Sequence, residues 1–254
     1  MNDVIEKKPE GQYRVIATAS LEAMEHLRSG LLNAELAYRI EENCKDGDET
    51  PFFIHRALVK NSVISSVCAL EANINEWFSS FESIAKEASA KAGVINQLWS
   101  LGIPRTAKYS IIEKYQIALT LLGVEKLNPG TNPYQSAKKI VKLRNALVHY
   151  EPTFEPDSNQ SQKGEFKSHS LGKELAGLFE LNPVCAEWAP MWPTKLLGAG
   201  CAKWCSETAL DFMEEFHRRD TSEVPGPMDR KQLLENTQYL ADTDWGNIFS
   251  NNRK

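Results

Sequence analysis

Apolar residues recur every three or four positions through most of this chain, and this spacing constrains the fold more than any other feature. The most regular stripe lies between residues 51 and 92 and holds Val59, Val63, Val67, Leu70, Ile74, Trp77 and Phe81. Such a period places apolar side chains on one face of an α-helix. Alternating patterns typical of strands are weak and short, so the sequence predicts an all-α fold.

Turn and cap signals divide the first 150 residues into four expected helices. These helices cover residues 19–43, 51–92, 108–122 and 133–150. The last one takes Asn132 as its cap and Pro133 as its first residue. It ends near Tyr150, because Pro152 disfavours helical geometry at the residue before it.

Residues 151–254 are richer in loop-forming stretches than the first 150 residues. A polar loop is expected over residues 151–170 and an irregular Pro- and Trp-rich stretch over residues 182–193. A short helix is expected over residues 171–180, and a long one over residues 194–218. We therefore predict three parts, a helical bundle over 1–150, a helical extension packed on it over 151–219, and an acidic, partly irregular tail over 220–254.

The composition is that of a globular protein in water, with 42% hydrophobic and 25% charged residues. No apolar run is long enough to span a bilayer, so we expect no membrane contact. The polar residues 1–11 lack the apolar core of a signal peptide, which predicts a cytoplasmic protein. Five cysteines, an odd count, then indicate reduced thiols. Cys201 and Cys205 lack a second pair of metal ligands, so we expect small buried side chains there, no metal and no cofactor.

Charge is unevenly distributed along the chain. Residues 1–150 hold 18 Lys and Arg against 17 Asp and Glu, whereas residues 151–254 hold 11 against 17. Between Glu125 and Glu151 there is no acidic residue, and the basic ones are Lys126, Lys138, Lys139, Lys142 and Arg144. A local cationic stretch attracts phosphate. The alternative is an ordinary solvated helix face.

Two charged residues are predicted on core-facing helical stripes. Arg144 lies on the stripe of Ile140 and Leu147, where an unpaired charge is costly. Glu71 lies within the stripe of the second helix, with Asn75 one turn further on. We expect Glu71 and Arg144 to meet between the two helices. The alternative is that each side chain extends outward to water by itself.

A second face of the helix over 133–150 forms a basic ladder that leads to a histidine. It holds Lys138, Lys142, Asn145 and His149 at spacings of four, three and four. The motif Arg144-Asn145-x-x-x-His149 closes this helix, and the long second helix carries the sequence Ala69-Leu70-Glu71-Ala72-x-Ile74-Asn75. Together these elements, over residues 15–150, resemble the HEPN superfamily, of the type with an Arg-x4-His ribonuclease motif.

The resemblance implies an up-and-down helical bundle with additional C-terminal helices, and metal-independent RNA cleavage. Arg144, His149 and Asn145 would be the catalytic residues, Glu71 and Asn75 would support them, and Lys138 and Lys142 would bind RNA. It also implies a homodimer with a composite Arg/His site at its interface. A toxin or phage-defence effector would be the biological setting, with an antitoxin or defence-system protein as partner.

Two other functions stay open at this point. One is a non-catalytic HEPN module that binds nucleotide, RNA or a partner protein. The other is a helical interaction protein that uses Trp188, Trp192 and Trp204 as a contact surface, although tryptophans are more often buried in the core. For His149 the alternative is a helix C-terminal residue, where a positive charge is favourable.

Overall fold

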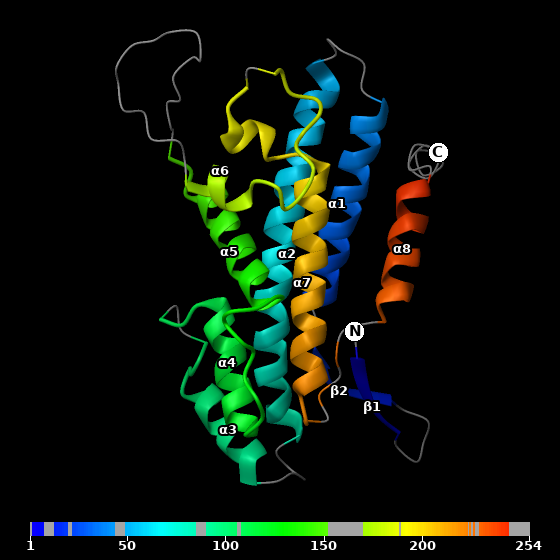
Figure 1. Ribbon diagram of the computed structural model, residues 1–254. Helices are drawn as coiled ribbons and strands as arrows, with labels where there is room; N and C mark the ends of the chain where they lie inside the picture. Colours follow the sequence, from blue (N-terminus) through cyan, green and yellow to red (C-terminus); the bar gives the residue numbers. More distant parts are fainter. Residues whose placement is uncertain are drawn as a thin grey trace.

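The computed structural model shows an elongated bundle of helices with a small hairpin near the N-terminus (Figure 1). It describes residues 2–7, 13–19, 22–43, 49–84, 90–105, 108–151, 170–187, 189–222, 224, 226 and 229–243. The elements in order are β1 (Asn2–Lys7), β2 (Tyr13–Ala19), α1 (Ala23–Asn43), α2 (Glu49–Ile84), α3 (Ala90–Ser100), α4 (Ile111–Leu122), α5 (Tyr134–Val148), α6 (Ser170–Leu175), η1 (Met191–Lys195), α7 (Ala199–Arg219) and α8 (Arg230–Asp242).

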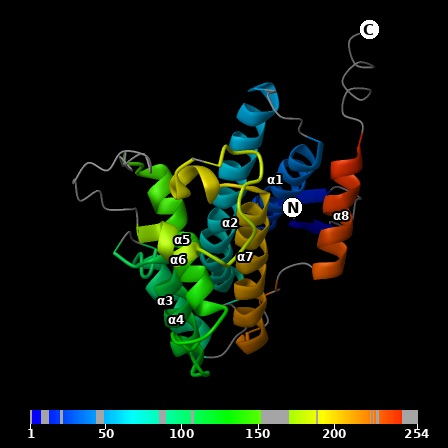
Figure 2. The same ribbon diagram turned by 45° about the horizontal axis from the view of Figure 1, so that its top comes forward.

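Three helices, α1, α2 and α7, form the centre of the molecule. They lie side by side in both ribbon views (Figures 1 and 2), and each packs against the other two. The 36 residues of α2 extend for roughly 54 Å, so this helix spans the whole bundle. All seven apolar residues of its predicted stripe are buried, which confirms the helical period between residues 59 and 81.

The other helices cover α2 and α1 from two sides. On one side α3, α4 and α5 pack against α2, and α5 also contacts α7. On the other side α8 packs against α1, with Leu233 buried. The helices before and after residue 150 thus contribute to one continuous core, because α7 packs against both α1 and α2. Within the region predicted as an acidic, partly irregular tail, α8 forms a regular helix with Asp229 as its cap.

Several predicted boundaries were wrong. The first helix begins at Ala23 rather than at residue 19, which belongs to the antiparallel hairpin of β1 and β2. The second ends at Ile84, and α3 is a separate helix from Ala90, so no single helix covers residues 51–92. The final helix begins at Ala199, five residues later than expected, after the short turn η1. The predicted loop over 151–170 falls almost entirely outside the described residues.

Cap chemistry explains why α4 and α5 begin where they do. Ser110 accepts a hydrogen bond from the Glu113 N–H, and the Glu113 side chain accepts one from the Ser110 N–H, which is a capping box. At α5, Pro133 occupies the cap position instead of the first helical position, so the predicted start was off by one residue.

Helices dominate the described residues, which confirms the all-α class, with the β1–β2 hairpin as its small exception. Among those residues, no helix combines the length and apolarity needed to cross a bilayer.

Candidate functional site

Glu71 on α2 and Arg144 on α5 lie together, as their places on core-facing stripes predicted. Arg144 Nη2 is 4.0 Å from Glu71 Oε2. This distance allows a charge interaction but is too long for a hydrogen bond. The Glu71 side chain is 45% exposed and that of Arg144 is 23% exposed, so the pair lies at the edge of the core.

Lys114 on α4 is a third member of this site, and the sequence analysis missed it. Its ammonium donates to Glu71 Oε1 at 3.1 Å and to Asn75 Oδ1 at 3.3 Å. The residue is only 3% exposed, so these two acceptors replace water as its partners. A signal was present, because Lys114 lies in register with the buried residues Ile111 and Ala118.

Arg144 retains unused hydrogen-bonding capacity. Its Nε atom is buried and has no hydrogen-bond partner. The Cys68 thiol lies near the guanidinium and Glu71. Burial raises the pKa of this thiol, and the positive charge of Arg144 partly offsets the effect. The cluster of Glu71, Asn75, Lys114 and Arg144, hereafter the Arg144 cluster, therefore holds two cations and one carboxylate. This excess of positive charge suits it to an anionic ligand.

His149 and Asn145 lie on the exposed side of the same helix end. His149 is the C-terminal cap of α5, and its backbone N–H donates to the Asn145 carbonyl at 2.8 Å. Within the described residues, neither side chain makes a hydrogen bond or ion pair. The structure thus brings Arg144 to Glu71 and Asn75, and it leaves His149 and Asn145 facing solvent.

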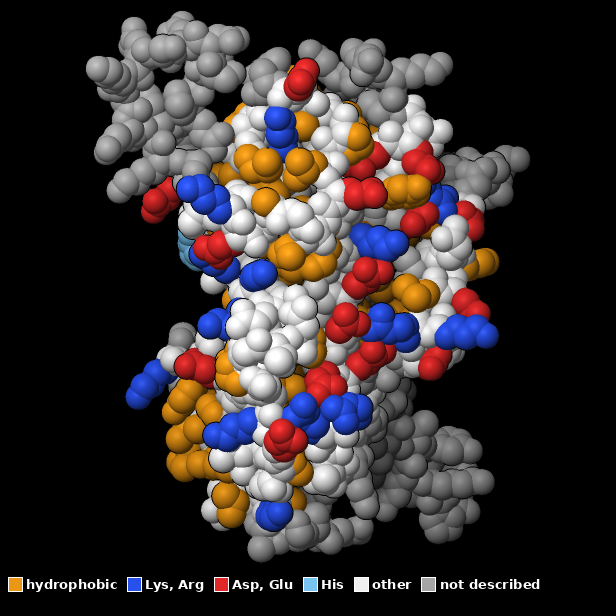
Figure 3. All heavy atoms as spheres, in the orientation of Figure 1, with side chains coloured by type: hydrophobic (Ala, Val, Ile, Leu, Met, Phe, Trp, Pro, Cys, Tyr) orange, Lys and Arg blue, Asp and Glu red, His pale blue; other side chains and the backbone are white. Residues whose placement is uncertain are grey.

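The two lysines of the predicted ladder are also exposed. Lys142 forms an ion pair with Glu174 of α6, whereas Lys138 extends into solvent. Figure 3 shows the charge on one face of the molecule, where Asp and Glu side chains gather over α7 and α8, interleaved with Lys and Arg. The stretch of α5, which has basic but no acidic side chains, therefore contrasts with the mixed charges of α7 and α8.

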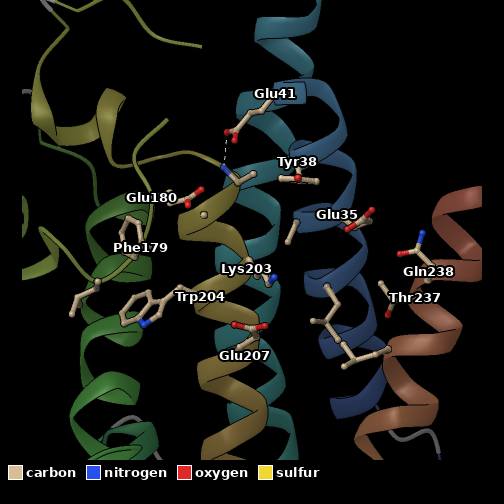
Figure 4. Close-up of a pocket in the computed structure, with 16 residues that line it drawn as sticks. Glu35, Tyr38, Glu41, Phe179, Glu180, Lys203, Trp204, Glu207, Thr237 and Gln238 are labelled. Carbon is tan, nitrogen blue, oxygen red and sulfur yellow. Dashed lines mark hydrogen bonds between the residues drawn. The ribbon is translucent and has the colours of Figure 1, made fainter. Parts of the chain in front are cut away.

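A groove of about 680 Å³ crosses α7 between α1, α8 and residues 178–180 (Figure 4). Trp204 and Phe179 lie on one side of α7 in this view, and Tyr38 lies on the other. The carboxylates Glu35 and Glu41 in its wall are already bound within the chain, to Arg39 and His55 respectively. The groove is therefore a weaker candidate for a charged ligand than the Arg144 cluster.

Glu41 joins three helices at the end of this groove. Its Oε1 lies 2.7 Å from His55 Nε2 of α2, and it accepts a hydrogen bond of the same length from the Ala199 N–H at the start of α7 (Figure 4). No sequence spacing relates His55 to Glu41, because the two residues lie on different helices. Since His55 is fully buried, we assign this contact to the core and not to a ligand site.

The cysteine and tryptophan predictions have clear outcomes where the structure describes the residues. Cys201 and Cys205 are fully buried, as expected, and no group of three His, Cys, Asp or Glu side chains in the described ranges is arranged to hold a metal. Trp192 is buried and Trp204 is half-buried, while Trp188 lies outside the described residues. Trp192 and Trp204 thus contribute more to the core than to a contact surface.

The chain was compared with known protein families, with curated proteins and with solved structures, and none of the three comparisons finds a match.

Proposed function

We propose that this protein is an RNA-cleaving enzyme of the HEPN type, which acts without a metal and uses Arg144, His149 and Asn145. The observation that carries the proposal is the state of Arg144. Its guanidinium is partly exposed, has a buried Nε without a partner, and shares a single carboxylate with a second cation. A phosphate group would accept hydrogen bonds from the exposed part of this guanidinium.

The chemistry needs only these side chains and the RNA itself. The 2′-oxygen of a ribose attacks the adjacent phosphorus, and the bond from phosphorus to the 5′-oxygen of the next nucleotide breaks. A histidine accepts the proton of the 2′-hydroxyl or supplies one to the leaving 5′-oxygen. Arg144 stabilises the charge that grows on the phosphate oxygens. The products carry a 2′,3′-cyclic phosphate and a 5′-hydroxyl.

Geometry within one chain favours a composite site. Arg144 and His149 are five residues apart, so on an ideal helix they point roughly 140° apart. In the structure Arg144 faces α2 while His149 caps the exposed end of α5. A two-fold dimer with the α5 helices at its interface would place the histidine of one protomer near the arginine of the other. Lys138 and Lys142 would then attract the RNA backbone beside the cleft.

A second candidate function is supported by the same separation. If α5 binds RNA or nucleotide as a monomer, Arg144 contacts phosphate and His149 takes no part in chemistry. The protein would then be a binding module, and a protein of a toxin or defence system would be its partner.

One experiment separates the two. Purified protein is incubated with RNA in EDTA, and the cleavage ends are analysed for 2′,3′-cyclic phosphate. We expect cleavage by the wild-type protein and a loss of about a hundredfold or more in His149→Ala and Arg144→Ala. Binding without cleavage by the wild-type protein supports the binding module. If both variants cleave RNA as well as the wild-type protein does, the catalytic assignment is contradicted.

The oligomeric state is tested in parallel. Sedimentation at micromolar concentration should give a dimer, and mixing His149→Ala with Arg144→Ala should restore part of the activity, because each mixed dimer then holds one complete composite site. A strictly monomeric protein that still cuts RNA would contradict the composite site.

A further inference from the structure

We infer that Lys114 is a positioning residue that keeps Arg144 available for an anionic ligand by holding the Glu71 carboxylate. This inference rests on the proposed function, since it concerns the same cluster. It adds a residue from a third helix that the Arg-x4-His motif does not include.

Lys114 holds the carboxylate more closely than Arg144 does. Its Nζ lies 3.1 Å from Glu71 Oε1, whereas Arg144 Nη2 is 4.0 Å from Glu71 Oε2. Asn75 accepts a second hydrogen bond from the same ammonium and so fixes its position. Because the Lys114 side chain is 4% exposed, water does not compete for these contacts.

Burial also excludes Lys114 as a direct ligand of RNA. An ammonium that is enclosed and already bonded to Glu71 and Asn75 has no open face toward a phosphate. The Arg144 side chain is 23% exposed and does have one. Lys114 therefore acts through Glu71 and leaves the contact with the ligand to Arg144.

Removing the charge of Lys114 has a definite consequence. Glu71 then loses its nearest cation, and its carboxylate turns toward Arg144, the other cation within reach. A bidentate pair would occupy the guanidinium and cancel its charge. The affinity for an anion would fall although Lys114 itself never touches the ligand.

The test measures binding of a single-stranded RNA in which every 2′-hydroxyl is methylated, so that no cleavage occurs. Five proteins are compared with the wild type by fluorescence polarisation: Lys114→Met, Glu71→Gln, the Lys114→Met/Glu71→Gln double variant, Arg144→Ala and Lys126→Met. Lys126 is an exposed lysine outside the cluster and serves as the charge-matched control. Circular dichroism and thermal unfolding verify that each variant is folded.

We expect Lys114→Met to weaken binding about tenfold, which corresponds to one charge-assisted hydrogen bond of the ligand. Glu71→Gln should bind at least as tightly as wild type, because no carboxylate competes for Arg144. The double variant should recover to within about threefold of Glu71→Gln. A merely structural role for Lys114 predicts no such rescue, since a second substitution would add to the damage.

Each outcome distinguishes this inference from the proposed function. Unchanged binding in Arg144→Ala overturns the proposed site itself. If Arg144→Ala binds weakly while Lys114→Met binds like Lys126→Met, only the positioning role is overturned. The same holds if the double variant stays as weak as Lys114→Met. If Lys114→Met does not fold, the affinity of Glu71→Gln for the methylated RNA is compared with that of the double variant. Equal affinities support the positioning role of Lys114, and a weaker affinity of the double variant overturns it.

Discussion

Arg144 Nη2 lies 4.0 Å from the Glu71 carboxylate, at the contact between α5 and α2, without a hydrogen bond to it. A protein selected only for stability would close such a gap or replace the buried charge with an apolar side chain. Because the two groups are not in direct contact, the Arg144 guanidinium at the edge of the core can still bind another anion. Functional sites commonly retain unsatisfied groups of this kind at a cost in stability.

Arg144→Met should therefore stabilise the fold while weakening RNA binding. Methionine keeps the apolar stem and removes the buried Nε that has no partner, which costs about 1–3 kcal/mol when unsatisfied. The loose contact with Glu71 contributes roughly 0–1 kcal/mol. We expect a net gain of about 1 kcal/mol in urea unfolding. Binding of the methylated RNA should fall about tenfold or more. A variant that loses both stability and affinity would show that Arg144 is structural.

Glu41 and Glu42 are neighbours in sequence, and we expect them to differ sharply in their contribution to stability. Glu41 is 10% exposed and connects His55 with the first N–H of α7. Glu42 is exposed, and among the described residues its one hydrogen bond is with Tyr38 on its own helix. Glu41→Ala should lower the free energy of unfolding by about 2–4 kcal/mol, because it leaves buried donors without an acceptor. Glu42→Ala should change it by less than about 0.5 kcal/mol. Equal effects in chemical denaturation would contradict this role of Glu41.

Two glycines on different helices should respond in opposite directions to alanine. A Cβ at Gly200 of α7 would lie 2.6 Å from the Glu180 carbonyl oxygen, so the backbone would have to move. Gly200→Ala should cost about 1–3 kcal/mol. A Cβ at Gly93 of α3 meets nothing within 4 Å, and Gly93→Ala should stabilise the helix by about 0.5–1 kcal/mol. Thermal unfolding of the two variants side by side measures both effects, and a stable Gly200→Ala protein would refute the close approach.

His217 should make stability depend on pH. Burial lowers the pKa of His217 below its usual value of about 6.5, although Asp220 acts in the opposite direction. Its Nε2 lies 3.1 Å from Asn73 Nδ2, which donates to the neutral ring. A folded-state pKa below the unfolded value means that the unfolded chain binds the extra proton first. Stability is thus fully present above about pH 6.5 and declines as the pH falls toward the lower folded-state pKa.

His217→Gln gives the matching control, because glutamine can accept from Asn73 and does not titrate in this range. Urea unfolding between about pH 5 and 8 should show a steeper acid-side loss for wild type than for the variant. Parallel curves for the two proteins would assign the pH dependence to other groups.

Some features of this protein follow from its sequence alone. The three- and four-residue period of α2, the Ser110 and Glu113 capping box and the glycine that ends α4 are local properties, because helix geometry and cap chemistry act over a few residues. The placement of Glu71 and Arg144 on core-facing stripes is of the same kind, since a helical wheel shows it. Local rules failed where context outweighed them, as at the end of α2 and the start of the separate helix α3.

Only the tertiary structure decided which charges meet. Nothing in the spacing of Lys114 relates it to Glu71, because α4 and α2 approach each other through the packing of their apolar faces. The same holds for Glu41 and His55, which lie on different helices. A single sequence records which side of a helix is buried, but the partner across the contact depends on how several helices fill one core. The sequence alone thus determined the stripe that carries Arg144, and the fold decided that Lys114, the nearer cation, holds the carboxylate expected to pair with it.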